Sequence, residues 1–350
     1  MKAIIHIGMK KTGSTSIQSW MASNRTALGA AGVRLIEGKV NAAALRNAAC
    51  HVARQEFGAD EDIVWPGRWK SERRDSDYDD LSAKFKKLSR KSGIFVYSHE
   101  GLYDCTKLHM TALDRFLARF FEDRTYVVYI RDSADFFVSM YSQKIVNFNK
   151  KFGSIPFSET VERCMRETVP FAEDSDFGNL LEWDSEFGKS LSVRLLDSGW
   201  LFTGDLIRDF ASLMGVESYQ IPKKLNESLS AEYIEYGREL LMKFGQGFRT
   251  NFREPVMKTL LEASSGKPKL SVSDEQAKSI YELRREEEEM IRIRFFPDRT
   301  GLFSPKRRGG GIAPAPLTPL RKAEIDSVIR KKLPRSVWKN FLHADELEGY

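Results

Sequence analysis

Small hydroxyl-bearing and basic residues near the start of the chain have the types and spacing to hold an anion. Residues 6–18 read HIGMKKTGSTSIQ, so that an apolar run passes into a turn between Gly8 and Gly13 and then into a predicted helix. We call residues 8–13 the glycine turn. A strand, turn and helix in this order point backbone N–H groups and a helix N-terminus at one place, which suits a phosphate or a sulfate. In the alternative interpretation, the glycines serve only the backbone and the lysines lie on the surface.

The position of the lysines in the glycine turn limits its chemistry. Gly8 and Gly13 have the spacing of the nucleotide triphosphate-binding loop, G-x-x-x-x-G-K-[ST]. Ser14 stands where that loop has its lysine, however, and Lys10 and Lys11 come earlier. The turn therefore lacks the lysine that reaches the outer phosphates of ATP, which argues against a kinase or an ATPase.

A second group of anion-binding residues lies further along the chain, where residues 125–143 read TYVVYIRDSADFFVSMYSQ. Arg131 ends a predicted strand, and Ser139 follows eight residues later on the next predicted helix. An arginine presents a planar fork of donors that matches phosphate oxygens, and a serine hydroxyl adds one more hydrogen bond. The alternative is that Arg131 pairs with Asp132 or Asp135 and that Ser139 lies on the helix surface.

Both groups resemble the donor site of the sulfotransferases that use 3′-phosphoadenosine 5′-phosphosulfate (PAPS). Residues 11–15, KTGST, are similar to the K-[ST]-G-[ST]-T core of that superfamily, and the longer string is similar to its bacterial members. Arg131 and Ser139 have the separation that the family uses to hold the 3′-phosphate. Weaker similarities follow at residues 191–216, 226–230 and 295–303, so the resemblance covers roughly residues 1–305.

The resemblance implies a P-loop enzyme that moves a sulfuryl group from PAPS to an acceptor hydroxyl. Lys11 would then neutralise charge on the bridging oxygen of the donor, and Arg131 with Ser139 would hold its 3′-phosphate. The residues implied to bind the 5′-phosphosulfate are Lys11, Thr12, Gly13, Ser14, Thr15 and Ser16. We expect no metal ion, because the lysine and the backbone dipoles can carry the developing charge.

Transfer to a hydroxyl needs a base that takes the acceptor proton. Residues 94–100, IFVYSHE, predict a strand that ends at His99 and Glu100, where ligands bind in open parallel sheets. Histidine has the more suitable ordinary pKa, and burial can raise the pKa of a carboxylate into the same range. The resemblance adds His51 and Glu37 as candidates, since family members also carry the base after the first helix. In the alternative interpretation, His99 and Glu100 only end the strand and start a helix.

The alternation of short apolar runs with helical patterns predicts the fold. The predicted strands are residues 3–7, 94–98, 125–130 and 191–196, with a weaker one at 33–36. The helical patterns between them are residues 15–31, 108–121, 134–148, 177–187 and 203–214. We therefore expect a three-layer α/β fold of the P-loop type with a central parallel sheet of about five strands. Residues 230–244, 252–263 and 273–296 predict a helical C-terminal half.

The resemblance and the composition together predict two parts. Residues 1–305 would form the sulfotransferase domain. Residues 306–350 would form a Gly/Pro linker and a basic, partly helical appendage, since GGGIAPAPLTPL at 309–320 is typical of a linker.

Charge, cysteine content and hydropathy limit the class of partner. The chain has 350 residues and a net charge of +6, a mild basic excess that suits an anionic ligand. It carries no nucleic-acid-binding motif, so we expect no nucleic acid partner. Three widely spaced cysteines predict reduced thiols and a cytoplasmic location. No stretch approaches the roughly 20 apolar residues of a membrane span.

Two other functions compete with sulfuryl transfer. A P-loop kinase for small molecules would use ATP and Mg²⁺, and a non-catalytic binder of sulfated or phosphorylated ligands would keep both anion-binding groups without a base. The acceptor of a sulfotransferase would be a saccharide, a lipid precursor, or a small alcohol or phenol. No pattern in the sequence selects among these acceptors or predicts an oligomeric state.

Overall fold

The computed structural model describes residues 1–36, 42–60, 76–147, 155–167, 177–220, 228–244, 253–306, 308–309 and 311–333. The chain divides into two compact units. Unit 1 comprises Met1–Asp132, Asp174–Lys223 and Glu286–Ser304. Unit 2 comprises Ser133–Glu173, Lys224–Arg285 and Pro305–Tyr350.

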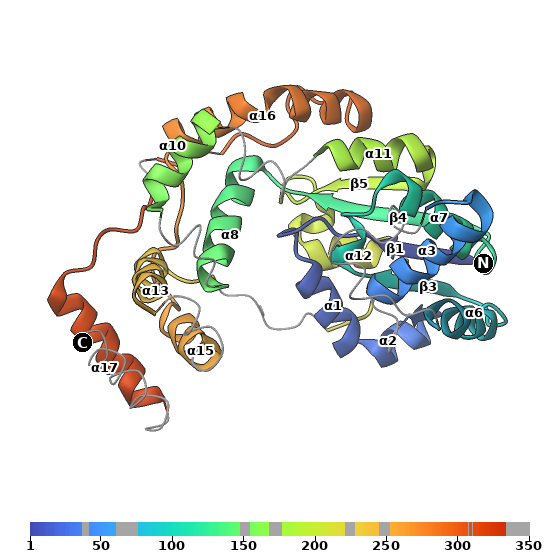
Figure 1. Ribbon diagram of the computed structural model, residues 1–350, viewed down its shortest axis with the longest axis horizontal. Helices are drawn as coiled ribbons and strands as arrows, with labels where there is room; N and C mark the ends of the chain where they lie inside the picture. The colour runs from blue at the N-terminus through green and yellow to red at the C-terminus, as the bar shows by residue number, and fades with distance from the viewer. Residues whose placement is uncertain are drawn as a thin grey trace. The chain divides into compact units, whose positions relative to one another are not determined.

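Unit 1 contains a five-stranded sheet in which every pair of neighbouring strands is parallel (Figure 1). Its strands are β1 (Lys2–His6), β2 (Val33–Leu35), β3 (Ile94–Ser98), β4 (Asp123–Ile130) and β5 (Leu191–Leu195). Their order across the sheet is β2-β3-β1-β4-β5. The strands form here because runs of Val, Ile and Tyr suit a sheet that is buried on both faces. This confirms the predicted α/β class with a central parallel sheet.

Helices cover both faces of the sheet in unit 1. Val127 and Tyr129 of β4 pack in one buried cluster with Trp20 and Phe210, which belong to helices on one face. Tyr126 of the same strand points to the other face, where its ring lies 5.4 Å from that of Trp183. The helices of the first face are α1 (Ser14–Ser23), α2 (Arg25–Ala30) and α12 (Leu206–Ser212). The helices of the second face are α3 (Ala42–Phe57), α6 (Asp77–Leu88), α7 (Lys107–Ala118) and α11 (Phe177–Phe187).

Unit 2 is helical in its described residues, apart from two isolated β-bridges. Its helices are α8 (Ser133–Val146), α10 (Phe157–Glu167), α13 (Ala231–Phe244), α15 (Arg253–Ala263), the first half of α16 (Asp274–Phe295) and α17 (Pro319–Lys332). Aromatic rings of Phe137 and Tyr141 on α8 pack against Phe157 on α10. Together with α12 and α16, these helices confirm the predicted helical C-terminal half.

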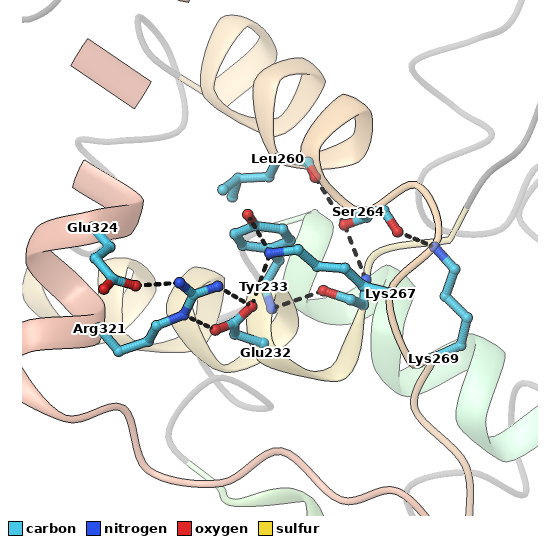
Figure 2. A network of polar contacts seen from close by, with 9 residues as sticks. Glu232, Tyr233, Leu260, Ser264, Lys267, Lys269, Arg321 and Glu324 are labelled. Atoms are coloured by element: carbon cyan, nitrogen blue, oxygen red, sulfur yellow. Dashed lines mark hydrogen bonds and ion pairs between the residues drawn. The ribbon is translucent and has the colours of Figure 1, made fainter. Parts of the chain in front are cut away.

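Helix α17 packs against the other helices of unit 2 through buried apolar residues and several ion pairs. Ile325 and Ile329 are 1% and 0% exposed. Figure 2 shows Glu232 of α13 accepting hydrogen bonds from Arg321 Nη2 at 2.9 Å and from Lys267 Nζ at 3.1 Å. The hydroxyl of Tyr236 donates to Asp326 at 2.5 Å. The described part of the basic C-terminal segment is therefore packed against the rest of unit 2. Thr318, the N-cap of α17, accepts a hydrogen bond from Arg321 N.

Candidate functional site

The glycine turn joins β1 to α1 and has an unusual backbone. Gly8, Lys11 and Gly13 all have positive φ angles, of 50°, 62° and 90°. Two of these positions are glycines, which adopt this region without cost, whereas Lys11 is held there against its preference. The hydroxyl of Thr12 is buried and donates to Met9 O at 2.6 Å, which closes the turn from inside. The hydroxyl proton of Thr12 is therefore used within the turn, where it stabilises the turn's shape.

The N-terminus of α1 is prepared for an anion. Gly13 is its N-cap and supplies no side-chain hydrogen bond to the first N–H groups of the helix. Helices leave these N–H groups without an internal partner, and they attract negative charge. Ser14 is only 4% exposed, yet its Oγ has no hydrogen-bond partner among the described residues. Thr15 is exposed and Ser16 is half-buried, so both hydroxyls can reach a ligand at the same helix end.

Two cations meet at the glycine turn. Arg131 follows β4 directly, and its Nη1 donates to the backbone carbonyl oxygen of Lys11 at 3.1 Å. Burial lowers the pKa of Lys11, the nearby charge of Arg131 lowers this pKa further, and the charge of Glu100 raises it. Lys11 therefore feels the charge of a second cation, Arg131, and the charge of a carboxylate, Glu100. A bound anion would relieve the repulsion between Lys11 and Arg131.

The end of β3 lies against the glycine turn. A Cβ atom built on Gly8 would come within 3.0 Å of Glu100 Cα and 2.8 Å of Ser14 Oγ, so only glycine lets these three segments meet. The backbone N–H of His99 donates to His6 O at 3.0 Å. The structure therefore brings Glu100, Lys11 and Arg131 to one edge of the sheet, as expected where the carboxyl ends of β3, β1 and β4 lie side by side.

The ring of His99 has a defined orientation. Its Nδ1 accepts a hydrogen bond from Gly101 N at 3.1 Å. Burial lowers the pKa of His99, while the charge of Glu100 raises it and that of Arg46 lowers it. The neutral ring therefore carries its proton on Nε2, because Nδ1 serves as the acceptor. In this tautomer, His99 presents a donor to a ligand, whereas the exposed Glu100 presents an acceptor.

Arg46 is a residue of this edge that the sequence did not single out. It lies on α3, and its Nη1 donates to Gly101 O at 3.2 Å, within the short 3₁₀ turn Glu100–Leu102. Lys10 forms an ion pair of 3.6 Å with Asp104 just beyond that turn. The Arg46 contact holds the segment that carries His99 and Glu100, whereas the partly exposed Lys10 pair adds little. The apolar residues that recur through 42–57 are typical of a helix, and this pattern could have placed Arg46 on α3.

Three further predicted residues are His51, Ser139 and Glu37. His51 of α3 stacks on the ring of Tyr78 at 4.0 Å, which gives it a packing role. Ser139 is half-buried on α8, in unit 2. Glu37 lies outside the described residues.

His6 belongs to the core of unit 1. It is fully buried between the rings of Tyr129 and Phe210, with Nδ1 2.7 Å from Ser98 Oγ. Burial lowers its pKa to about 3, so the ring is neutral at neutral pH.

Among the described residues, no group of three or more His, Cys, Asp or Glu side chains is arranged to hold a metal ion. In the same part of the chain, no helix has the length and apolar character to cross a membrane. Comparisons with family models, with curated proteins and with solved structures found no match for this chain.

Proposed function

We propose that this chain is a sulfotransferase that uses PAPS as its donor. The observation that carries the proposal is the meeting of Lys11, Arg131 and Glu100 at the N-terminus of α1, beside the unpartnered hydroxyl of Ser14. A helix N-terminus with two cations suits a ligand with two anionic groups, and a carboxylate at the same place suits proton removal.

The donor would bind with its 5′-phosphosulfate on the glycine turn. The N–H groups after Gly13 and the hydroxyls of Ser14, Thr15 and Ser16 would bond its oxygens, and Lys11 would neutralise the bridging oxygen. Arg131 would take the 3′-phosphate with its planar guanidinium, which can bond two phosphate oxygens in a forked arrangement. The participation of Ser139 in that subsite rests on the sequence resemblance.

Glu100 is the base that we propose, with His99 as its neighbour. An exposed carboxylate can accept the proton of an acceptor hydroxyl directly. His99, with its proton on Nε2, would donate a hydrogen bond to the acceptor or to a sulfuryl oxygen. Arg46 would keep the 3₁₀ turn that carries both residues in place.

The proposed reaction is a direct displacement at sulfur. The acceptor oxygen forms a bond to sulfur while the bond from sulfur to the bridging oxygen breaks. The acceptor proton goes to Glu100, and the electron pair of the broken bond leaves on the 5′-phosphate of adenosine 3′,5′-bisphosphate. Lys11 and the helix N-terminus would stabilise the charge that develops on this phosphate, so positioning and electrostatics supply the acceleration.

The proposed acceptor is a hydroxyl of a saccharide, a lipid precursor, or a small alcohol or phenol. Cys50 and Cys105 are buried thiols, and reduced thiols agree with the cytoplasmic location that we propose.

Calorimetric titration with adenosine 3′,5′-bisphosphate, ADP and ATP·Mg²⁺ tests the proposal. We expect the bisphosphate to bind with a Kd in the micromolar range or below and the other two to bind more weakly. Preference for ATP·Mg²⁺ would instead favour a kinase. Tight binding of the bisphosphate without transfer in E100Q and wild type alike, over a panel of labelled-PAPS acceptor reactions, would favour a non-catalytic binder.

A further inference from the structure

The carboxyl end of β3, which leads to His99 and Glu100, extends past the end of the neighbouring strand β2. Among the described residues, the last hydrogen bond between these strands runs from Ile36 N to Val96 O at 2.9 Å. Alternate residues of a strand direct their carbonyl oxygens to the same neighbour, so Ser98 O points to the side of β2 as Val96 O does. Because β2 ends at Leu35, opposite Val96, the carbonyl oxygen of Ser98 must find its donor elsewhere.

Gln18 of α1 supplies this donor. Its Nε2 donates to Ser98 O at 3.1 Å, although the two residues stand 80 positions apart in the chain. Gln18 is half-buried, and it follows Ser14 by four residues, so both side chains lie on the same face of α1. A side-chain amide from a helix therefore takes the place of a strand neighbour.

The same face of α1 lies beside Glu100. A Cβ atom built on Gly8 would come within 2.8 Å of Ser14 Oγ and 3.0 Å of Glu100 Cα, so Ser14 and Glu100 are packed around one glycine. One helical turn further along α1, Gln18 bonds Ser98, two residues before Glu100. The helix whose N-terminus forms the proposed donor site thus follows the segment of the proposed base over two successive turns.

Other elements hold the same segment from other sides. His6 of β1 lies 2.7 Å from Ser98 Oγ through its Nδ1, and its carbonyl oxygen accepts from His99 N at 3.0 Å. Arg46 of α3 donates to Gly101 O from the other face of the sheet. In the described part of the chain, the hydrogen bond of Gln18 is the one that joins this segment to α1. Gln18 therefore links the base to the donor-binding helix itself.

We propose that Gln18 is a positioning residue that sets the place of Glu100 relative to the bound donor. The inference rests on the proposed function and adds a residue that acts through the base. By holding Ser98 O, Gln18 fixes the start of the turn that carries Glu100 against the helix that binds the phosphosulfate. Displacement at sulfur needs an aligned acceptor oxygen, and a misplacement of about 1 Å can lower a rate about 100-fold.

Turnover and donor affinity test this role in wild type, Q18M and Q55M. Turnover is measured with labelled PAPS and the better of two acceptors, 4-nitrophenol and N-acetylglucosamine, and affinity by calorimetry with adenosine 3′,5′-bisphosphate. Methionine keeps the length and helix preference of glutamine but cannot donate to Ser98 O. Gln55 is exposed on α3, so Q55M makes the same change on the surface of unit 1. We expect Q18M to lower turnover about 10-fold or more at an unchanged Kd, and Q55M to behave like wild type.

A double-mutant cycle with E100Q separates positioning of the base from general support of the fold. If Gln18 acts through Glu100, Q18M should cost less than about twofold in a protein that already lacks the base. Three results would overturn the role: wild-type turnover in Q18M, a Kd that weakens in step with turnover, or an equal loss from Q18M with and without Glu100.

Hydrogen exchange at the backbone amides of His99 and Gly101 gives a readout that needs no acceptor. These N–H groups donate to His6 O and to His99 Nδ1. Q18M should speed their exchange about fivefold or more, as for the loss of one hydrogen bond, whereas Q55M should not. In a protein that binds the bisphosphate, unchanged exchange in Q18M would overturn the inference alone. A wild type that binds no bisphosphate would remove the proposed function, and the inference with it.

Discussion

The Nη1 of Arg131 donates a hydrogen bond of 3.1 Å to the backbone carbonyl oxygen of Lys11. This contact ties the end of β4 to the glycine turn and brings two cations together, so that the charge of Arg131 lowers the pKa of Lys11. Proteins place like charges side by side where a ligand of opposite charge is to bind, and such shifted groups cluster at functional sites. The relationship is the basis of the donor site that we propose.

Lys11 should act on the reaction rather than on the fold. Lys11→Gly keeps the positive φ of 62° without strain, so we expect this variant to fold normally. We expect Lys11→Gly and Lys11→Ala to lower turnover at saturating donor by about 100-fold or more, by analogy with the loss of one preorganised donor. Initial rates with labelled PAPS measure this effect. The control is Lys10→Ala, which removes the neighbouring lysine that pairs with Asp104; equal losses in both positions would contradict a special role of Lys11.

Glu100→Gln should remove the base while keeping the shape of the 3₁₀ turn. We expect turnover to fall by roughly 100-fold or more, the usual contribution of a general base, with the affinity for adenosine 3′,5′-bisphosphate unchanged. His99→Gln should reduce turnover less, because the held tautomer presents a donor to the ligand. Glu122→Gln, a change of an exposed carboxylate before the start of β4, serves as the control. A larger loss of turnover in His99→Gln than in Glu100→Gln would mean that His99, and not Glu100, is the base.

His6 makes the stability of unit 1 depend on pH. Its folded pKa of about 3 lies below the ordinary value of 6.5, so between these values the unfolded chain binds a proton that the folded chain does not. The free energy of unfolding should therefore fall as the pH is lowered through this window, by up to about 1.4 kcal/mol for each pH unit from this residue. Urea denaturation between pH 6 and pH 4.5 measures the slope in wild type and in His6→Asn. An identical slope in the two proteins would show that His6 does not contribute.

Helix α17 should depend more on its apolar contact than on its ion pairs. Ile329 is fully buried, and Ile329→Ala should destabilise unit 2 by about 2–4 kcal/mol. Lys332 pairs with Glu262 on the surface at 2.9 Å, where solvent screens the interaction, so Lys332→Ala should leave the urea midpoint nearly unchanged. Limited proteolysis of the C-terminal segment gives an independent reading. A larger effect of Lys332→Ala than of Ile329→Ala would mean that ion pairs hold the helix.

The strands were predictable because each is a short, buried apolar run between polar turns. The predicted strand at 94–98 agrees with β3, and the other four differ from the structure by one or two residues at an end. The helix predicted at 15–31 is instead two helices that meet at Asn24. The side chain of Asn24 bonds both the N–H and the carbonyl oxygen of Gln220, and a contact between residues so distant in the chain leaves no local pattern.

The candidate site was predictable to the extent that it follows from strand ends. Glu100, His99 and Arg131 come directly after predicted strands, and parallel strands bring their carboxyl ends to one edge. Arg46 was not predictable in this way, because it lies on α3 and meets the site only through Gly101. The packing of Leu206 of α12 against Gly13 likewise exists only in three dimensions.

The most direct measurement of the donor site compares adenosine 3′,5′-bisphosphate with adenosine 5′-monophosphate in wild type and in Arg131→Ala by calorimetry. We predict that wild type prefers the bisphosphate and that Arg131→Ala loses roughly 1.5–3 kcal/mol of binding free energy for the bisphosphate, as for a hydrogen bond to a charged group. The affinity for the monophosphate should hardly change, so the preference should nearly vanish. Equal losses for both nucleotides, or a wild type that does not distinguish them, would contradict the assignment of Arg131 to the 3′-phosphate and with it the proposed use of PAPS.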